Sequence, residues 1–464
     1  MAPSVQINGI DRTLEGVDAN TTLLNFVRGL GLTGTKEGCA EGECGACAMV
    51  WISTTQGRAQ FEPINSCLVL AHATQGRQVW TAEGLARGDT LHPVQQAMID
   101  AGGSQCGYCT PGFVISLFAE YYRAGRDGYD PESISGNLCR CTGYRPIRDV
   151  AQALGTPAED DPFVTTLAAY EPNAAASADA GAPGPKFVQP TSLSELFDAL
   201  DKGPSRLVAG GTDVVVEMNQ NHVRHPRIVA IDRVEELRAV KLSKDEVEIG
   251  AGVPLAELER TLAEVPMFEE LFPLFSSRLI RNRATLGGNL VNASPIGDSP
   301  PVLLALGAEL VLARRGGTRR VALDGFFTAY RKTILEDGEI VRSVVIPRPF
   351  PTDTRFYKVS KRVMDDISTV AAAFAIDRSG GVVTAARLAY GGVAATPARA
   401  HDAEQALIGS PWNGATVSHV CKVLRKTFTP MTDHRGSADY RAAMVERLFQ
   451  KFHSELSIPM APAD

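Results

Sequence analysis

The chain has 464 residues, of which 44% are hydrophobic and 21% charged, and this ordinary composition excludes a mainly disordered or fibrous protein. Its formal net charge of −7 excludes a general binder of nucleic acids or anionic membranes. The longest apolar run, from Val302 to Ala313, is too short to span a bilayer, and the N-terminus lacks the pattern of a secretory signal. We therefore expect a soluble, cytoplasmic protein of about three domains.

The distribution of cysteines is uneven. Eight of the nine lie within the first 141 residues, and the ninth, Cys421, stands alone. The reducing cytosol disfavours a disulfide framework, so the clustered thiols indicate ligation of a metal or cluster. Cys421 is interpreted as a small buried hydrophobe without a functional role.

Residues 1–86 predict a ferredoxin-like α+β domain of the β-grasp type. A strand at residues 5–7 runs into an Asn8–Gly9 turn, a helix is expected at 22–28, and another strand is expected at 48–53. A loop rich in glycine and cysteine, residues 34–47, lies between the helix and the second strand.

The first cysteine set has the plant-type spacing of a 2Fe–2S cluster and comprises Cys39, Cys44, Cys47 and Cys67. Gly38, Gly42 and Gly45 allow the loop to turn its backbone N–H groups towards the cluster sulfurs. The alternative is a zinc loop with four thiolates, but zinc sites usually show paired short spacings.

Residues 87–157 predict a helical domain with helices at 111–122, after Asp130–Pro131, and at 144–154. The second cysteine set belongs to this domain and comprises Cys106, Cys109, Cys139 and Cys141. Two cysteine pairs could also hold zinc, although a Cys-x-Cys pair is tight for an ordinary zinc ribbon.

The sequences at 105–112 (QCGYCTPG) and 136–144 (GNLCRCTGY) resemble the second cluster domain of the molybdenum hydroxylases. This resemblance covers residues 1–157 and implies a four-helix bundle that clamps a 2Fe–2S cluster between the two cysteine pairs. It also implies that Gln105 contacts the pterin of a molybdenum cofactor in a partner domain.

Residues 158–186 are expected to form a linker, because residues 173–185 carry no large apolar side chain. Strands and helices alternate after this segment. We expect an α+β domain over 187–347 and a C-terminal mixed α/β domain over 348–464, with a hairpin of strands 371–376 and 382–390.

Residues Leu207 to Asp213 predict a buried strand that enters a double-glycine turn. Such a turn can offer backbone N–H groups to a pyrophosphate, although an ordinary tight turn has the same pattern. A second pattern, at 285–290 and 294–298, changes the interpretation. Together they resemble the FAD-binding (PCMH-like) domain shared by xanthine dehydrogenase and the carbon monoxide dehydrogenase flavoprotein.

The resemblance implies a set of FAD contacts. The residues expected along the diphosphate and adenosine are Arg206, Leu207, Val208, Ala209, Gly210, Gly211, Thr212, Asp213 and Val214. Those expected along the pyrophosphate and ribityl chain are Thr285, Gly288, Asn289 and Asp298, and Ile340 and Val341 are also assigned to FAD. Lys358 would reach the pyrimidine edge of the flavin, and Phe275 would stack on the isoalloxazine ring.

Residues Gly250 to Gly252 imitate a Rossmann fingerprint between a strand and a helix. The position of the third glycine is occupied by Leu255, which prevents the close helix approach that the motif requires. We interpret this segment as a plain strand-to-helix turn.

The domain order resembles the small subunit of the bacterial xanthine dehydrogenase type of molybdenum hydroxylase. That resemblance implies a molybdopterin-binding large subunit as partner, in a heterodimer that dimerises to a heterotetramer. Electrons from oxidation of hypoxanthine and xanthine to urate would pass through the second cluster, the first cluster and FAD to NAD. The alternatives are the reductase subunit of a hydroxylase acting on aldehydes or N-heterocycles, and a pure electron-transfer protein without an NAD site.

Two further residues are assigned to the acceptor side by resemblance. Tyr330, within residues 326–332, would pack beside the nicotinamide, and Asp365, within residues 362–367, would lie over the flavin. A carboxylate there opposes the anionic reduced flavin. Asp365 is thus expected to act catalytically together with Phe275. The alternative is that Asp365 and Asp366 form a solvated turn.

Overall fold

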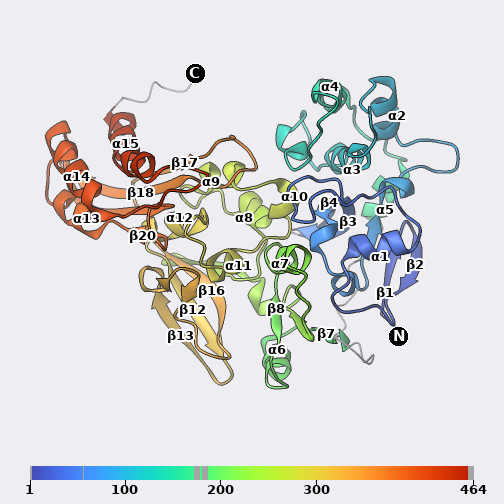
Figure 1. Ribbon diagram of the computed structural model, residues 1–464, viewed down its shortest axis with the longest axis horizontal. Helices are drawn as coiled ribbons and strands as arrows, with labels where there is room; N and C mark the ends of the chain where they lie inside the picture. Colours follow the sequence, from blue (N-terminus) through green and yellow to red (C-terminus); the bar gives the residue numbers. More distant parts are fainter. Residues whose placement is uncertain (1–2, 56, 172–177, 180–185, 458–464) are drawn as a thin grey trace. The chain divides into compact units, whose positions relative to one another are not determined.

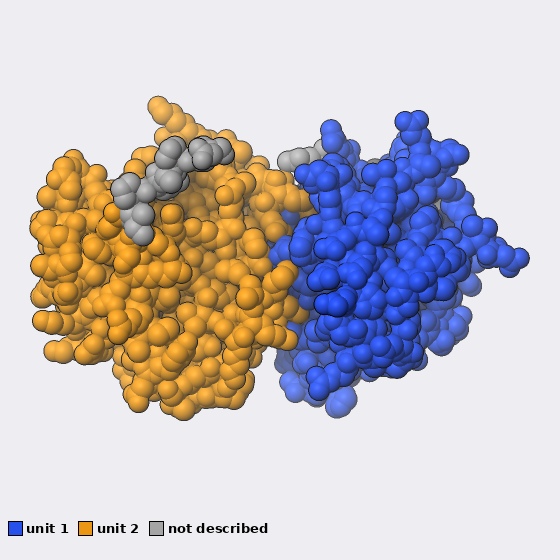
Figure 2. Space-filling model, turned by 90° about the horizontal axis from the view of Figure 1, so that it is seen from above, with its two compact units in different colours: residues 1–235, 254–257, 276–284 blue, residues 236–253, 258–275, 285–464 orange. Residues whose placement is uncertain are grey.

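The computed structural model describes residues 3–55, 57–171, 178–179 and 186–457. The chain forms two compact units (Figure 2): the first comprises Met1–Glu235, Pro254–Glu257 and Ser276–Ala284, and the second comprises Glu236–Val253, Leu258–Phe275 and Thr285–Asp464. Residues 187–347, expected to be one domain, are therefore divided between the two units. In the described residues, no helix has both the length and the apolar character needed to cross a membrane.

The first unit begins with a β-grasp domain. Its mixed sheet has the order β2-β1-β5-β3-β4. The strands are β1 (Ser4–Ile7), β2 (Ile10–Thr13), β3 (Ala48–Thr55), β4 (Arg58–Asn65) and β5 (Gln78–Trp80), and the helix is α1 (Leu23–Gly29). Asn8 and Gly9 both have positive φ values, 53° and 80°, as a tight hairpin turn requires. The strand, turn and helix predictions for this domain are confirmed.

The helical domain follows, with α2 (Pro93–Asp100), α3 (Thr110–Tyr121), the 3-10 turn η4 (Pro131–Ile134) and α4 (Arg145–Ala153). The helix predicted after Asp130–Pro131 is therefore only a short 3-10 turn. Asp130 does cap it by accepting the Glu132 N–H at 2.9 Å. The turn ends there because residues from Gly136 onward enter the loop of the second cysteine set.

The linker predicted at 158–186 begins too early. Helix α5 (Pro162–Ala168) lies within it, capped by Asp161, whose side chain accepts the Phe163 N–H at 2.7 Å. Phe163 is buried and packs edge-on against Phe61 and Phe118, so α5 belongs to the core of the helical domain. The remainder of the predicted linker lies largely outside the described residues.

The first unit also contains a mixed sheet in which β9 lies parallel to and between β7 and β8, with β6 (Ala178–Asp179) antiparallel beside β7. Its elements are β7 (Lys186–Gln189), α6 (Leu193–Leu200), β8 (Arg206–Val208), α7 (Val214–Gln220) and β9 (Arg227–Ala230). The predicted strand that enters the double-glycine turn is β8.

The second unit contains an antiparallel sheet of order β10-β11-β16-β12-β13. The strands are β10 (Val240–Leu242), β11 (Glu246–Gly250), β12 (Glu309–Arg314), β13 (Gly317–Ala322) and β16 (Ile340–Pro347), with β14 (Phe327–Ala329) and β15 (Lys332–Thr333) as a separate hairpin. Helices between these strands are α8 (Leu255–Thr261), α9 (Phe268–Leu271), α10 (Arg278–Arg281), α11 (Leu286–Val291) and α12 (Ser299–Ala305), of which α10 and the start of α8 (255–257) belong to the first unit. Gly250 to Gly252 form the predicted turn between β11 and α8.

The C-terminal part of the second unit has a sheet of order β17-β18-β19-β20, against which α13, α14 and α15 pack (Figure 1). The strands are β17 (Asp353–Val359), β18 (Val370–Ser379), β19 (Val382–Gly391) and β20 (Ala398–Arg399), and the helices are α13 (His401–Leu407), α14 (Gly414–Thr427) and α15 (Ala438–Ser457). Strands β18 and β19 confirm the predicted hairpin, whose turn contains Gly380 and Gly381. Cys421 is buried in α14, as expected.

Candidate redox-cofactor sites

The first cysteine set lies in two segments, the loop before β3 and the turn after β4. The thiols approach one another in pairs: the sulfurs of Cys47 and Cys67 are 3.3 Å apart, and Cys39 interacts with Cys44. Each of the two irons in a 2Fe–2S cluster takes two of the four thiolates, so a paired arrangement fits this cofactor.

Glycines line this loop where a side chain has no room. A Cβ on Gly38 would lie 2.7 Å from the sulfur of Cys44. Gly42, with φ of 88°, has no room for a Cβ because Ile280 and Leu68 would each lie 2.6 Å from it. The sequence predicted glycine at Gly38, Gly42 and Gly45 for backbone conformation. Gly42 and Gly45 do have positive φ, 88° and 63°, whereas Gly38 is required by lack of space.

Hydrogen bonding favours the thiolate form of Cys39. The side chain of Cys44 and the N–H of Glu41, at 3.5 Å from the sulfur, together lower the pKa of Cys39 to about 5 despite partial burial. The same pairing raises the pKa of Cys44. A loop that already stabilises a thiolate is suited to ligation of an iron–sulfur cluster.

The second cysteine set is also paired, Cys106 with Cys141 and Cys109 with Cys139. Cys109 is the N-cap residue of α3, and the other pair member Cys139 lies in the loop before α4. Burial opposes ionisation of Cys139, but hydrogen bonds from the hydroxyl and N–H of Thr142 outweigh it and lower the pKa. Cys106 and Cys141 are exposed.

The two cysteine loops are hydrogen-bonded to each other. The N–H of Leu138 donates to the carbonyl of Cys44 at 3.0 Å, and the Asn137 side chain donates to the carbonyl of Gly45 at 3.3 Å. Asn137 is buried and is itself held by Ser116 at 2.7 Å. No role for Asn137 could be predicted from the sequence, because its partners are set by the packing of the two domains.

The double-glycine turn after β8 is closely packed. A Cβ on Gly210 would overlap the backbone carbonyl group of Arg283, whose carbon would lie 2.5 Å away. Gly211 has φ of 84°, and a Cβ there would lie 2.5 Å from the carbonyl oxygen of Leu68. Leu68 directly follows Cys67, so this turn lies against the loop of the first cysteine set.

Helix α7, which begins where this turn ends, also holds the first cysteine loop. The Asn219 side chain donates to the carbonyls of Ala40 and Cys67, both at 2.9 Å, and Gln220 donates to the carbonyl of Cys39 at 2.8 Å. Sequence reasoning missed these two residues. No local signal could have found them, since their partners lie more than 150 positions away.

The second unit contains the other predicted FAD segment. Thr285 caps α11 by accepting the N–H of Gly288 at 3.1 Å, and Gly288 is exposed at the helix start. The side-chain oxygen of Asn289 is buried and has no hydrogen-bond partner among the described residues. An unsatisfied buried acceptor beside an exposed glycine fits a site for a ligand with hydroxyl groups, such as the ribityl chain of FAD.

Asp298 and Lys358, predicted separately for the flavin, form a buried ion pair at 2.8 Å with side chains 8% and 2% exposed. Ser368 donates to the other oxygen of Asp298 at 2.5 Å. The ammonium group of Lys358 also donates to the carbonyl of Leu274, next to Phe275, at 2.6 Å. The fold thus brings three predicted FAD residues close together.

Asp365 is buried, with 6% of its surface exposed, and has a left-handed φ of 49°. Asp366 holds the loop by accepting the N–H groups of Arg362 at 2.8 Å and Ile367 at 2.9 Å. A solvated turn is therefore wrong for Asp365, and its position over the flavin stays a prediction.

The other predicted site residues occupy varied environments. Phe275, Ile340 and Val341 are buried in the second unit. Tyr330 is 60% exposed in the turn between β14 and β15. Gln105 is exposed beside Cys106, where a partner could reach it.

Four known domain families match the chain in order. Residues 5–72 match the 2Fe-2S iron-sulfur cluster binding domain, and 81–152 match the [2Fe-2S] binding domain. Residues 182–349 match the FAD binding domain in molybdopterin dehydrogenase, and 355–456 match the CO dehydrogenase flavoprotein C-terminal domain. The chain is therefore an iron–sulfur flavoprotein in its domain composition.

Similar proteins give the family. Xanthine dehydrogenase 2 of Arabidopsis thaliana is 30% identical over 97% of this chain and 40% of its own length, and the xanthine dehydrogenase of Emericella nidulans is 31% identical over 97% and 38%. The chain thus spans about two-fifths of the length of these curated relatives. It belongs to the molybdenum hydroxylase family and corresponds to the electron-transfer region that carries the Fe–S and FAD domains.

Solved structures of two other enzymes are also similar. The carbon monoxide dehydrogenase of Hydrogenophaga pseudoflava matches with a TM-score of 0.55 and 29% identity, over 58% of this chain and 96% of the matched chain. Quinoline 2-oxidoreductase of Pseudomonas putida 86 matches with a TM-score of 0.55 and 27% identity, over 59% and 96%.

Proposed function

We propose that the chain is the electron-transfer subunit of a xanthine dehydrogenase. It would carry electrons from a molybdenum site on a large partner subunit to NAD during oxidation of hypoxanthine and xanthine to urate. The supporting observation is the contiguity of three loops in the first unit. The second cysteine loop bonds the first through Leu138 and Cys44, and the first contacts the double-glycine turn through Leu68 and Gly211.

The residues proposed to hold the cofactors are the ones predicted from the sequence. Cys106, Cys109, Cys139 and Cys141 would hold one 2Fe–2S cluster, and Cys39, Cys44, Cys47 and Cys67 the other. The FAD residues are likewise the predicted ones, and in the second unit they comprise the α11 segment with Asp298 and Lys358 near the flavin. When bound, these groups supply one-electron carriers and a flavin that exchanges electron pairs with NAD.

The chain's own contribution is positioning. Because Asn219 and Gln220 donate to three carbonyls of the first cysteine loop, the helix after the FAD turn fixes that loop in place. The exposed Cys106 and Cys141 lie near Tyr108 and Leu138 in sequence, which are 47% and 43% exposed. This surface is suited to a partner that delivers electrons, and exposed Gln105 would reach the molybdenum cofactor from it.

Xanthine is favoured as the substrate because the xanthine dehydrogenase relatives align over 97% of the chain, across all four domains. The matched chains of the carbon monoxide and quinoline enzymes correspond to only 58% and 59% of it. A reductase subunit for aldehydes or N-heterocycles is the second candidate. We also propose that the complex of this chain with its large partner subunit is a heterotetramer and is located in the cytoplasm.

Purification of the chain with its native partner tests the substrate. The complex should reduce NAD with xanthine and hypoxanthine and form urate, and it should do so faster than with an aldehyde, quinoline, nicotinate or carbon monoxide. Faster turnover of any of these competitors would assign the chain to another molybdenum hydroxylase. A reduced complex that passes no electrons to NAD would instead support a pure electron-transfer protein.

Asp365→Asn is expected to slow NAD reduction at least about tenfold, about 1.4 kcal/mol of barrier, and to raise the share of electrons that form peroxide. Without the carboxylate, the anionic reduced flavin is more stable and is a weaker hydride donor. Asparagine tolerates the left-handed backbone of this position better than most residues. The measurements are NAD kinetics, peroxide yield and FAD content.

Asp337→Asn is the matched control, since Asp337 is exposed in the same unit. It should leave all three measurements unchanged. Unchanged NAD kinetics and peroxide yield in the Asp365→Asn protein would remove Asp365 from the acceptor site.

A further inference from the structure

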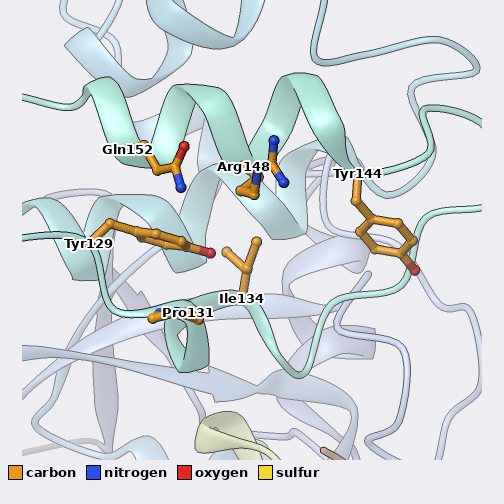
Figure 3. Close-up of a pocket in the computed structure, with 6 residues that line it drawn as sticks. All are labelled: Tyr129, Pro131, Ile134, Tyr144, Arg148 and Gln152. Atoms are coloured by element: carbon orange, nitrogen blue, oxygen red, sulfur yellow. The ribbon is translucent and has the colours of Figure 1, made fainter.

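A pocket of about 540 Å³ lies between α4 and the segment around η4 (Figure 3). It is lined by Tyr129, Pro131, Ile134, Tyr144, Arg148 and Gln152. Figure 3 shows Tyr144 apart from the other five residues, at the start of α4, with its hydroxyl directed away from Arg148 and Gln152. The hydroxyl of Tyr144 therefore has its partner outside the pocket.

The backbone at Tyr144 is costly for its residue type. Its φ is 67°, in the left-handed region, and it follows Gly143 with φ of 68°. Bulky residues seldom adopt this conformation because Cβ crowds the following carbonyl oxygen. The N–H of Tyr144 bonds the Thr142 hydroxyl at 3.2 Å, which holds the turn closed.

This turn directs the Tyr144 ring back to a proposed cluster ligand. Its hydroxyl oxygen accepts the backbone N–H of Cys139 at 2.9 Å. The ring also contacts Phe113 edge-on, with centroids 6.3 Å apart. The sulfur of Cys139 has its own donors, the Thr142 N–H at 3.4 Å and the Thr142 hydroxyl at 3.1 Å. The amide and the sulfur of Cys139 are thus held by different residues.

We propose that Tyr144 is a positioning residue that keeps the Cys139 N–H from the sulfurs of the second cluster and so lowers the reduction potential of that cluster. N–H groups that bond cluster sulfurs stabilise the additional negative charge of the reduced form, and solvent exposure acts alongside them. The proposal rests on the ligand set proposed above. It adds the Tyr144 hydroxyl, which is not a cluster ligand, as a group that controls the reduction potential of the second cluster.

Tyr144→Phe tests the hydroxyl while it keeps the ring against Phe113. In an anaerobic dithionite titration of the full chain, followed by electron paramagnetic resonance, one of the two cluster steps should move to a higher potential. At the wild-type midpoint potential, where the wild-type cluster is half reduced, the ratio of reduced to oxidised cluster in the variant should rise about threefold. This corresponds to a shift of roughly 30 mV for one electron. The other cluster step should not move.

Two control variants make the result specific. Thr142→Val, which removes the hydroxyl near the Cys139 sulfur, should shift the same step and so identifies it as that of the second cluster. Tyr129 lines the same pocket, and its hydroxyl has no hydrogen bond to the cysteine loop among the described contacts. Tyr129→Phe should therefore shift neither step. An unmoved or lowered step in the Tyr144→Phe protein with full iron content overturns the proposal. A wild-type chain that lacks a second cluster step overturns the ligand set instead.

Discussion

Replacement of Cys109 with serine is expected to stop electrons that arrive from the partner subunit. In the complex, NAD reduction driven by the partner's substrate should fall at least about a hundredfold, about 2.7 kcal/mol of barrier. Cys109 is the N-cap residue of α3 and lies beside Cys139, so the variant would lose one of the four thiolates proposed to hold the second cluster. NADH oxidation by an artificial acceptor should persist, because that reaction needs the proposed NAD and FAD sites but not the second cluster.

Cys421→Ser is the matched control for the same chemical change. Cys421 is buried in α14 with its sulfur 3.9 Å from the carbonyl of Glu446, far in sequence from both cysteine sets. Its substitution should leave both activities intact. A parallel loss of both activities in the Cys109→Ser protein would contradict the proposed order of centres, and unchanged partner-driven activity would remove Cys109 from the ligand set.

Gly210→Ala is expected to weaken FAD binding about ten- to hundredfold. The new Cβ would overlap the backbone carbonyl of Arg283, which cannot move freely because the Arg283 side chain pairs with buried Asp232 at 3.4 Å. Overpacking of this kind costs about 1–3 kcal/mol, and each 1.4 kcal/mol is a tenfold change in affinity. The FAD-to-protein ratio after dialysis and an FAD titration measure the effect.

Gly128→Ala provides the comparison, since a Cβ there meets no atom within 4 Å. FAD binding should remain normal in that variant, and iron content should remain normal in both. Wild-type FAD affinity in the Gly210→Ala protein would contradict the assignment of the turn after β8 to the cofactor.

The cysteine spacings and hairpins could be predicted because their signals are local. Asn8–Gly9 specifies its turn by its own backbone preferences, and Cys39, Cys44 and Cys47 lie within a single loop. Asp130–Pro131 predicted where a helix begins but not how long it is, because its end is set by the loop that follows. The same cap and proline at Asp161–Pro162 were overlooked within a segment interpreted as linker.

The contacts between loops could not be predicted. Leu138 bonds Cys44, and Asn219 bonds Cys67, only because separate domains pack against each other within the first unit. The left-handed turn at Tyr144 likewise depends on a hydrogen bond to Cys139 that no propensity encodes. These contacts lie along the route proposed for electrons. Each sequence motif identifies one site, and the contacts that join the sites are seen only in the structure.

An anaerobic titration of the purified chain with NADH tests the central claim most directly. The chain should contain about four iron and four acid-labile sulfide, and about two NADH per chain should bleach the flavin and cluster absorbance completely, since FAD takes two electrons and each cluster takes one. Dithionite should reach the same end point. Full bleaching by dithionite without any bleaching by NADH would contradict the NAD site, and an end point near one NADH per chain would contradict the presence of two clusters together with FAD.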